Sequence, residues 1–588
     1  MAAEKWMVKN KKADFKEIGR RFGVSEVLAR LLVNRDIKEP DQIETYLHPD
    51  RTMLYSPFLM KDVERACQIL MAKIDAGARI RIIGDYDVDG VVSVYVLYTA
   101  LTRLKASVDY RIPDRITDGY GINRSMIDQA YGDGVDTILT CDNGIAASDQ
   151  IEHAKQLGMT VIVTDHHDIP YEETEQGKQY RIPDADVVIN PKQLDCGYPF
   201  KGLCGAAVAF KLVTALFAMA GIEDQADEYI PYVAIATVCD VMDLTDENRV
   251  LVSLGLKELQ KTKNPGLSML IAENGLVPEQ LGAYHLGFVL GPCLNATGRL
   301  ETADRGVELL LADDPDTAEK LAAELKELND KRKSMTKDGV EEALEIVEEE
   351  LSKDMVLVVY LPDCHESLAG IVAGRIREAS GKPAIVLTDS GGILKGSARS
   401  IEAYNIYEEL VKCRDLLLKF GGHPLAAGMS LAKENLEEFR RRLNENCRLT
   451  KEDIIPKVSI DIVMPLGYVT EELIQELTLL EPFGRGNPKP LFAERGLILR
   501  RACAIGKTTR FLKFRVENAY GRIMDALYFG NADELDRAIA DRFGSEELAK
   551  LYQGRENTVR MSVTYYPSVN EYNGTRRLQI VIQNIMLE

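Results

Sequence analysis

The sequence predicts an α/β protein in which a parallel-sheet lobe is joined by a long helix to a second α/β lobe and followed by a small β-barrel. Between residues 79 and 190, strand-like apolar runs recur about every 25 residues with helical segments between several of them, which is typical of βαβ units. Residues 317–351 are rich in Ala, Leu, Glu and Lys and carry apolar residues at helical spacing. From residue 456 onward β-type runs dominate, which favours a barrel.

The order of these patterns divides the chain of 588 residues, which is too long for one hydrophobic core. We expect a helical lead-in over residues 1–49, the parallel-sheet lobe over 50–315 and the connecting helix over 316–352, with a possible break near Lys337-Asp-Gly339. The second lobe is expected over 353–450 and the barrel over 451–588. The expected strands of the first lobe are Arg79–Ile83, Ser107–Ile112, Val135–Thr140, Thr160–Thr164 and Asp186–Ile189.

Composition and charge narrow the class of protein. No apolar run approaches the roughly 20 residues of a membrane span, and the first residues lack the apolar core of a signal peptide. The ten cysteines form no CxxC pair, which indicates a reducing, cytoplasmic environment. The net charge of −20 argues against a basic nucleic-acid-binding coat. Residues 451–588 are nevertheless neutral, with 19 basic and 19 acidic side chains, and the window from Arg495 to Arg515 holds seven basic residues and no acidic one.

Ionisable residues follow four apolar runs. Buried carboxylates are costly unless a cation neutralises them, and in parallel sheets ligands bind at the carboxyl ends of the strands. Carboxylates with imidazoles suit Mn²⁺ or a related divalent ion, and this many ligands could hold two ions, as used for in-line phosphoryl displacement. Each motif alone is more typical of a turn, a helix cap or a solvated histidine, so the prediction depends on their joint occurrence. The residues are Asp85, Asp87 and Asp89 in DYDVDG, Asp142 in CDNG, His166 and His167 in DHH, and Asp240 after Tyr232–Val238.

These motifs resemble the metal motifs of the DHH phosphoesterase superfamily. Four further motifs narrow the resemblance to the single-strand-specific exonucleases within it: GYGIN at 119–123, GPCLNATGR at 291–299, GGHPLAAG at 421–428 and PFGRGNP at 482–488. The resemblance covers the chain from about residue 50 to the last residue. It implies that residues 50–315 form the metal-binding catalytic domain, 353–450 the DHH-associated substrate-binding domain and 451–588 an OB-fold that binds nucleic acid.

The resemblance also implies roles for individual residues at the metal site. Asp142 is expected to bridge the two ions, and His167 to act near the scissile phosphate. Asp85 is expected to support catalysis. Some superfamily members have a histidine where this chain has Ile83, so the second ion is expected to be held less firmly. The implied metal ligands are Asp87, Asp89, Asp142, His166 and Asp240.

Phosphate and DNA contacts are predicted in three places. Asn295 and Arg299 lie in a segment that reads as a flexible turn ending in an arginine, for which a solvated arginine is the alternative. Small residues around Ser397 and Arg399 would let backbone N–H groups approach a phosphate. In the barrel, alternate residues of one strand share a face, so an aromatic ring and two cations would lie together. This combination suits stacking on the bases and neutralisation of the phosphates of single-stranded nucleic acid. The alternative is a phenylalanine buried in the core with solvated cations around it. The predicted residues of the last two places are Arg375, Ser397, Arg399 and His423, and Phe511, Lys513 and Arg515.

The sequence therefore predicts a cytoplasmic 5′–3′ exonuclease that uses Mn²⁺ or Mg²⁺, two ions in all, to degrade single-stranded DNA to mononucleotides in repair and recombination. The 5′–3′ polarity and the mononucleotide product follow from the resemblance alone. The resemblance also implies a protein partner, which is a single-strand-binding protein, a helicase or a recombinase. We expect a monomer that does not contact membranes. The alternatives are a phosphodiesterase for short oligonucleotides or cyclic dinucleotides, a non-catalytic DNA-binding scaffold, and an inorganic pyrophosphatase.

Overall fold

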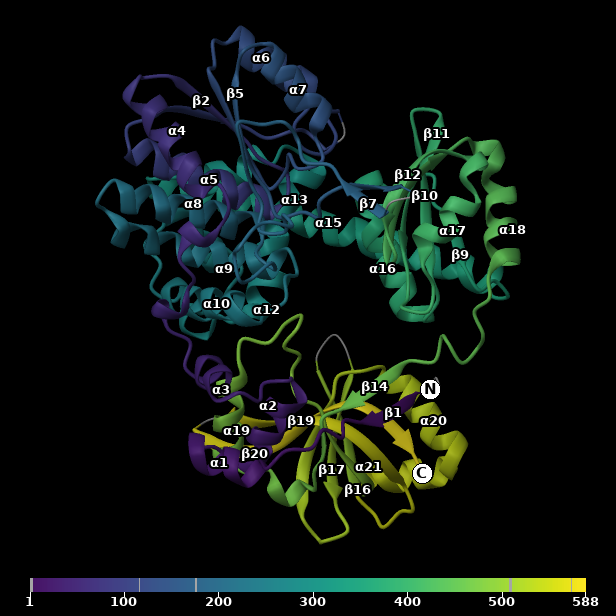
Figure 1. The fold of residues 1–588 in the computed structure, drawn as a ribbon. Coiled ribbons are helices and arrows are strands. Elements are labelled where there is room, and N and C mark those ends of the chain that lie inside the picture. Colours follow the sequence, from purple (N-terminus) through teal and green to yellow (C-terminus); the bar gives the residue numbers. More distant parts are fainter. Residues whose placement is uncertain (1–3, 116, 175–176, 507–509, 573) are drawn as a thin grey trace. The chain divides into compact units, whose positions relative to one another are not determined.

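The computed structural model describes residues 4–115, 117–174, 177–506, 510–572 and 574–588. They form two compact units (Figure 1). The larger unit consists of Pro49–Asp453 with Pro482–Asn487, and the barrel unit of Met1–His48, Ile454–Glu481 and Pro488–Glu588. Among the described residues, none of the helices combines the length and the apolar character needed to cross a lipid bilayer.

A five-stranded parallel sheet forms the first lobe of the larger unit, in the order β3-β2-β4-β5-β8. Strands β2 and β4 are buried almost throughout, as expected for a sheet covered on both faces. The chain returns from β3 to β4 on the other side of β2, so the strand order reverses between β2 and β4. Ligands bind at such a reversal point, at the carboxyl edge. The strands are β2 (Arg79–Ile83), β3 (Ser107–Arg111), β4 (Thr137–Cys141), β5 (Thr160–Thr164) and β8 (Val187–Ile189).

Helices cover this sheet and complete the lobe. Helix α5 (Val88–Arg103) follows β2, and the predominantly apolar helices α8 (Gly205–Met219) and α9 (Ile230–Cys239) pack with it in the largest hydrophobic core. Residues 200–315 are mostly helical. The other helices used below are α10 (Asp246–Leu259), the one-turn π-helix Leu286–Leu290 and α13 (Gly291–Leu300).

The predicted connecting helix is α15 (Pro315–Glu349), and the break predicted at 337–339 is wrong because this helix is continuous. A glycine inside a helix costs about 1 kcal/mol relative to alanine, and packing against the next lobe offsets this. A Cβ on Gly339 would lie 3.5 Å from Val372 of α16 (Ala369–Ser380), an ordinary packing distance, so alanine would also fit at this position.

The second lobe is a five-stranded sheet in the order β12-β13-β11-β10-β9, in which only the β9–β10 pair is parallel. Helices α16, α17 (Ile406–Lys412) and α18 (Leu436–Asn446) accompany it. The strands are β9 (Leu357–Tyr360), β10 (Ala384–Ser390), β11 (Ile393–Arg399), β12 (Leu417–His423) and β13 (Ala426–Leu431).

The barrel unit closes because β16 pairs with both β17 and β19. The N-terminal segment, predicted as a separate helical lead-in, groups with this unit as far as His48. Its strand β1 (Lys5–Val8) pairs in parallel with β14 (Lys457–Ile460). The barrel strands are β15 (Ile462–Val463), β16 (Phe492–Ile505), β17 (Phe511–Glu517), β18 (Ile523–Tyr528), β19 (Arg560–Tyr572) and β20 (Thr575–Leu587). The helices are α1 (Phe15–Phe22), α2 (Glu26–Asn34), α3 (Pro40–Leu47), α19 (Glu471–Leu477), α20 (Ala532–Phe543) and α21 (Ser545–Gln553).

A buried ion pair between Lys211 of α8 and Glu247 of α10 ties the helices of the first lobe together. Both side chains are almost fully buried. The Glu247 carboxylate also accepts hydrogen bonds from the Tyr198 hydroxyl at 2.6 Å and the Tyr55 backbone N–H at 2.9 Å. The Lys211 ammonium donates to the Tyr55 carbonyl at 2.8 Å. The pair is therefore fully hydrogen-bonded, and removing one partner would leave an uncompensated buried charge.

Substituting Lys211→Met is expected to lower the free energy of unfolding by about 3–5 kcal/mol, because Glu247 would stay buried without a cation. The matched control is Lys326→Met on α15, which breaks an exposed pair with Asp330 and should leave the free energy of unfolding nearly unchanged. Urea unfolding followed by circular dichroism measures both. Equal losses in the two variants would contradict this account of the first lobe.

Candidate metal centre and phosphate pocket

The DYDVDG segment caps α5 with its own carboxylate. Asp87 is the N-cap residue, and its side chain accepts hydrogen bonds from the backbone N–H groups of Asp89 at 2.9 Å and Gly90 at 3.1 Å. The turn is so tight that a Cβ on Gly90 would lie 2.3 Å from the Asp85 carbonyl oxygen. The cap interpretation and the metal interpretation are thus compatible, because the cap uses only one carboxylate oxygen of Asp87.

Asp89 is held by the start of α8. Its carboxylate accepts from the backbone N–H groups of Gly205 at 2.6 Å and Ala206 at 2.8 Å, where the helix dipole favours negative charge. A side chain at position 205 is excluded, since a Cβ on Gly205 would lie 2.6 Å from the Cβ of Asp142. Gly205 therefore lets the helix approach two carboxylates at once.

Asp142 follows β4 in a left-handed backbone conformation with φ of 60°, which is uncommon for a residue other than glycine. Its N–H donates to the Thr164 carbonyl at 3.1 Å. The next residue, Asn143, donates from its amide to the Ile83 carbonyl at 3.1 Å and so ties the β4 loop to the end of β2. Strained conformations of this kind persist where neighbouring bonds hold them, and they cluster at functional sites.

Asp165 organises the Asp-His-His segment after β5. It accepts from the backbone N–H groups of Ile145 at 2.9 Å, His166 at 2.7 Å and His167 at 3.0 Å, and from the His167 ring at 2.8 Å. Burial acts to raise the pKa of Asp165, but the His167 hydrogen bond and the other contacts lower it. Burial acts to lower the pKa of His167, but Asp165 outweighs this and raises it to about 9. At neutral pH His167 is therefore an imidazolium paired with a carboxylate.

The loops converge around His166. Its Nε2 lies 3.1 Å from Asp142 Oδ1, 3.6 Å from Asp89 Oδ2 and 3.7 Å from Asp240 Oδ2. Asp240 is the C-cap of α9, so the apolar run before it is a helix and not a strand. Three groups each have possible ligand atoms within 4.8 Å of one another: Asp142, His166 and His167; Asp89, His166 and Asp240; and Asp85, Asp87 and Asp142.

Unsatisfied buried atoms show that this donor set fits divalent cations. Within the described part of the chain, Asp85 Oδ1, Asp142 Oδ1 and both ring nitrogens of His166 are buried without a hydrogen-bond partner. Burial, followed by the charge of neighbouring carboxylates, raises the pKa of Asp85 and of Asp240 to about 8. Burial lowers the pKa of His166, which keeps the imidazole neutral and able to ligate. Carboxylate oxygens with a neutral imidazole suit Mn²⁺ or Mg²⁺.

Tyr120 adjoins the centre and was not predicted as a site residue, although the GYGIN motif contains it. Its hydroxyl donates to the Asp142 carbonyl at 3.0 Å and lies 3.2 Å from His167 Nε2. Gly119 and Gly121 on either side have positive φ angles of 82° and 68°, which turn the chain sharply enough to present the ring. Sequence reasoning also missed Asp165 as the residue that orients His167.

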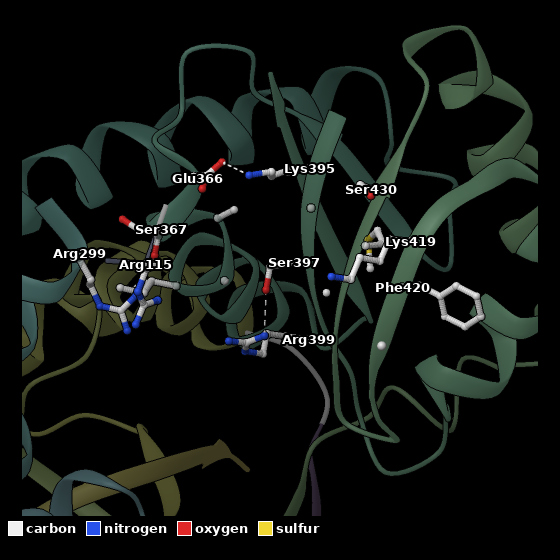
Figure 2. A pocket seen from close by; sticks show the side chains of 17 residues that line it. Arg115, Arg299, Glu366, Ser367, Lys395, Ser397, Arg399, Lys419, Phe420 and Ser430 are labelled. Carbon is white, nitrogen blue, oxygen red and sulfur yellow. Dashed lines mark hydrogen bonds and ion pairs between the residues drawn. The ribbon is translucent and has the colours of Figure 1, made fainter. Parts of the chain in front are cut away.

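A cavity of about 590 Å³ lies between the first and second lobes of the larger unit (Figure 2). Arg115 and Arg299 line one side, and Lys395, Ser397, Arg399 and Lys419 come from the second lobe. The Arg299 guanidinium donates to the Ser367 carbonyl at 2.7 Å, and the Arg399 guanidinium to Ser397 Oγ at 3.1 Å. Arg115 stacks over the Tyr86 ring at 4.0 Å.

Lys395 of this pocket pairs with Glu366 at 3.0 Å, whereas no ion pair of Arg299 or Arg399 with a carboxylate is found among the described residues. Burial, and then the nearby charges of Arg115 and Arg332, lower the pKa of Arg299 to about 10. Burial and Arg377 also lower the pKa of Arg399. A bound anion would stabilise both guanidinium groups. A Cβ on Gly370 would lie 2.8 Å from Arg399 Nη2 and from Ser397 Oγ, so the glycine leaves room for this arrangement. The pocket has the chemistry of a phosphate site.

The structure separates the predicted phosphate residues into two sets. Arg299, Ser397 and Arg399 line the pocket. Arg375 instead pairs with Glu378 on the exposed side of α16, at 3.0 Å, and His423 lies exposed near the end of β12. Neither of these two is among the residues that line the pocket. Arg115 and Lys419 line it and were not predicted.

The flexible turn predicted at 295–299 is wrong, because these residues lie within α13. Gly298 serves close packing and not a turn, since a Cβ there would lie 2.2 Å from the Tyr86 carbonyl oxygen. The Asn295 side chain accepts a hydrogen bond from the Val88 N–H at 3.2 Å, at the start of α5. Asn295 therefore contacts the metal loop, whereas Arg299, one turn later, lines the phosphate pocket.

In the barrel unit, Phe511, Lys513 and Arg515 share the more exposed face of β17, as predicted from their alternation. Phe511 contacts Phe529 edge to face at 5.2 Å between ring centroids. The Lys513 ammonium pairs with Asp525 at 2.8 Å, so part of the positive charge on this face is neutralised. Lys507, which belongs to the basic window, lies outside the described residues.

Comparison with known proteins identifies the domains of the chain. Family models match residues 79–237 (DHH family, N-terminal domain), 353–449 (DHHA1 domain) and 460–584 (RecJ OB domain). The single-stranded-DNA-specific exonuclease RecJ of Bacillus subtilis is 37% identical over 99% of this chain and 70% of its own length. RecJ of Escherichia coli is 35% identical over 95% of each chain. The crystal structure of Thermus thermophilus RecJ in complex with Mn²⁺ matches with a TM-score of 0.82 at 27% identity, over 99% of this chain and 79% of that one. The crystal structure of its complex with Mg²⁺ matches with a TM-score of 0.76.

The raised pKa values predict that metal binding depends on pH. Below pH 8 Asp85 and Asp240 are protonated, so Mn²⁺ must displace protons, and its affinity should rise by up to about tenfold per pH unit for each proton displaced. Isothermal titration with Mn²⁺ between pH 6 and pH 8.5, under nitrogen and in buffers of different ionisation enthalpy, measures affinity and proton release together. A constant affinity without proton release would show that neither Asp240, a predicted ligand, nor its neighbour Asp85 loses a proton when the ion binds.

Proposed function

Since the chain belongs to the RecJ family of single-stranded-DNA-specific exonucleases, we propose that it is a metal-dependent exonuclease that degrades single-stranded DNA from the 5′ end to mononucleotides. The observation that carries the proposal is the link between the metal centre and the phosphate pocket. Helix α13 contacts the metal loop through Asn295 and lines the pocket through Arg299, four residues later and on the same helix face. A phosphate held in the pocket therefore places its neighbour along the strand near the metal centre.

The proposed metal ligands are Asp87, Asp89, Asp142, His166 and Asp240. Bound Mn²⁺ or Mg²⁺ ions would supply an activated water and stabilise negative charge on the phosphate oxygens. Asp142 is suited to hold two ions because it belongs to two of the overlapping ligand groups and has two oxygens to share. Asp85 supports the site beside Asp87 and Asp142. The buried Ile83 offers no ligand at the edge of β2, so we propose that the second ion is held less firmly.

His167 acts on the substrate in this proposal. Its side chain is 44% exposed, it carries a proton at neutral pH, and Asp165 fixes its ring. An imidazolium at the open side of the centre can hold a non-bridging phosphate oxygen or give its proton to the leaving oxygen. Tyr120 orients the same ring through its hydroxyl. The Arg115, Arg299, Ser397 and Arg399 side chains bind a backbone or terminal phosphate.

The barrel unit would also bind single-stranded DNA. Phe511 offers a ring for base stacking, and Lys513 and Arg515 offer positive charge on the same face. Arg375 and His423 are not among the residues that line the pocket, so we leave them out of the proposed phosphate site. We further propose that the protein acts in DNA repair and recombination as a cytoplasmic monomer. Its free cysteines fit a reducing compartment. We propose a single-strand-binding protein, a helicase or a recombinase as its protein partner.

The substitution Asp142→Ala tests the activity. On 5′-labelled single-stranded DNA with Mn²⁺, wild-type protein should release labelled mononucleotides. The activity of the variant should fall by more than about 100-fold, because removing even a residue that only supports a metal ligand typically costs about 10–100-fold. Duplex DNA and a dinucleotide are run beside the long strand. Intact single strands with wild-type protein, or a preference for the dinucleotide, would contradict the proposed function, and the second result would favour a short-oligonucleotide phosphodiesterase.

Arg399→Ala tests the phosphate pocket separately from the chemistry. Losing a charged hydrogen bond of about 1.5–3 kcal/mol should raise the KM for single-stranded DNA by about 10–100-fold with a smaller change in kcat. Arg375→Ala is the matched control on the neighbouring helix and should leave the KM close to wild type. If the two variants behave alike, or only Arg375→Ala raises the KM, the pocket is not the phosphate site.

A further inference from the structure

The loop that follows Asp240 carries unusual backbone strain. Val241 has a φ of 54° and Asp246 a φ of 48°, both in the left-handed region. The N–H of Val241 donates to the Val238 carbonyl at 3.2 Å and that of Met242 to the Thr237 carbonyl at 3.1 Å, which closes the end of α9. Glycine is the usual residue at this position of a helix end, and a β-branched residue there is an outlier. The valine conformation therefore needs support from outside the helix.

That support comes from a segment distant in the sequence. Residues Pro482–Asn487, which lie between two stretches of the barrel unit, group with the larger unit. The Leu244 N–H donates to the Arg485 carbonyl at 2.8 Å, and the Arg485 guanidinium donates to the Val241 carbonyl at 3.3 Å. The same guanidinium lies 3.1 Å from the Asp243 carboxylate. Arg485 thus contacts the loop at three successive points after Asp240.

Two glycines allow this close approach. A Cβ on Gly484 would lie 2.7 Å from a side-chain carbon of Leu244. Gly486 has a φ of 72°, and a Cβ there would lie 2.9 Å from the Cβ of Asp243. Reciprocal backbone hydrogen bonds between Gly484 and Asn487, at 3.0 and 3.2 Å, form the tight turn that presents Arg485. The segment is shaped to dock on this loop.

Asp240 needs such support more than the other candidate ligands. It caps the C-terminal end of α9, where the helix dipole disfavours a carboxylate, whereas Asp87 and Asp89 accept hydrogen bonds from helix N-termini. Its side chain is 27% exposed, compared with 1% for Asp89 and 2% for Asp142. Among the described residues, no hydrogen bond donated to the Asp240 carboxylate is found, in contrast to Asp87 and Asp89.

We propose that Arg485 is a positioning residue for the metal centre: it holds the strained Val241 loop, and thereby keeps the Asp240 carboxylate facing His166 and Asp89. This inference rests on the metal centre of the proposed function. It gives the PFGRGNP motif a role that neither the ligand set nor the phosphate pocket explains. It also makes six residues from outside the first lobe part of the machinery that binds the ion.

The test measures Mn²⁺ affinity of the full-length protein without DNA, by isothermal titration or by the electron paramagnetic resonance signal of free Mn²⁺. Arg485→Ala should weaken binding by about tenfold, the low end of what loss of a ligand-orienting group costs. Val241→Gly alone should bind as wild type, because glycine adopts the left-handed conformation without support. The double variant Arg485→Ala with Val241→Gly should recover affinity to within about twofold of wild type.

The control is Arg441→Ala, which removes an exposed arginine that pairs with Glu438 and Glu445 on α18 and should leave Mn²⁺ affinity unchanged. Wild-type affinity in Arg485→Ala would overturn the inference. The inference would also be overturned if Arg485→Ala lost Mn²⁺ affinity, Val241→Gly did not restore it, and circular dichroism and melting temperature stayed unchanged. If Mn²⁺ binding follows the expected pattern but single-stranded DNA stays intact, the proposed function fails and the positioning role stands.

Discussion

Repulsion among buried carboxylates at the carboxyl edge of the first sheet governs the structure around it. Asp85, Asp89 and Asp142 are at most 2% exposed, so water does not screen them. Backbone donors offset part of the cost: the start of α8 binds Asp89, and the start of α5 binds Asp87. Asp142 Oδ1 and the two ring nitrogens of His166 have no hydrogen-bond partner and are available to bind cations. The loops therefore hold these carboxyl groups together before an ion arrives, and burial with mutual repulsion raises the pKa values of Asp85, Asp142 and Asp240.

Close packing is the second consequence of concentrating ligands in so small a volume. Gly90, Gly205 and Gly298 lie where a Cβ would collide with the Asp85 backbone, the Asp142 side chain and the Tyr86 backbone. Each glycine brings a helix against a ligand loop. The same requirement explains why a glycine-containing motif such as NATGR reads as a turn in the sequence and is a helix in the structure. Glycine signals close approach as well as chain reversal.

The parts that could be predicted from the sequence depend on local pattern. Parallel strands end at one edge, so acids after successive apolar runs had to meet, and the alternation along β17 had to place Phe511 with Lys513. Contacts between distant segments have no such signal. Strand β1 is four residues long and pairs with β14 near the other end of the sequence. The contributions of Arg115 and Lys419 to the pocket depend on how two lobes pack. Arg375 pairs with Glu378 on the exposed side of α16, which shows that proximity to an apolar run does not fix which way a helical side chain points.

The link through α13 also bears on how a strand is presented to the metal centre. Asn295 accepts a hydrogen bond from the Val88 N–H at the start of α5, and Arg299, one turn later, lines the pocket. A displacement of α13 would therefore move the Arg299 guanidinium together with the loop that carries Asp87. In the proposed reaction, one helix thus couples the group that binds a phosphate to the loop that holds the ions.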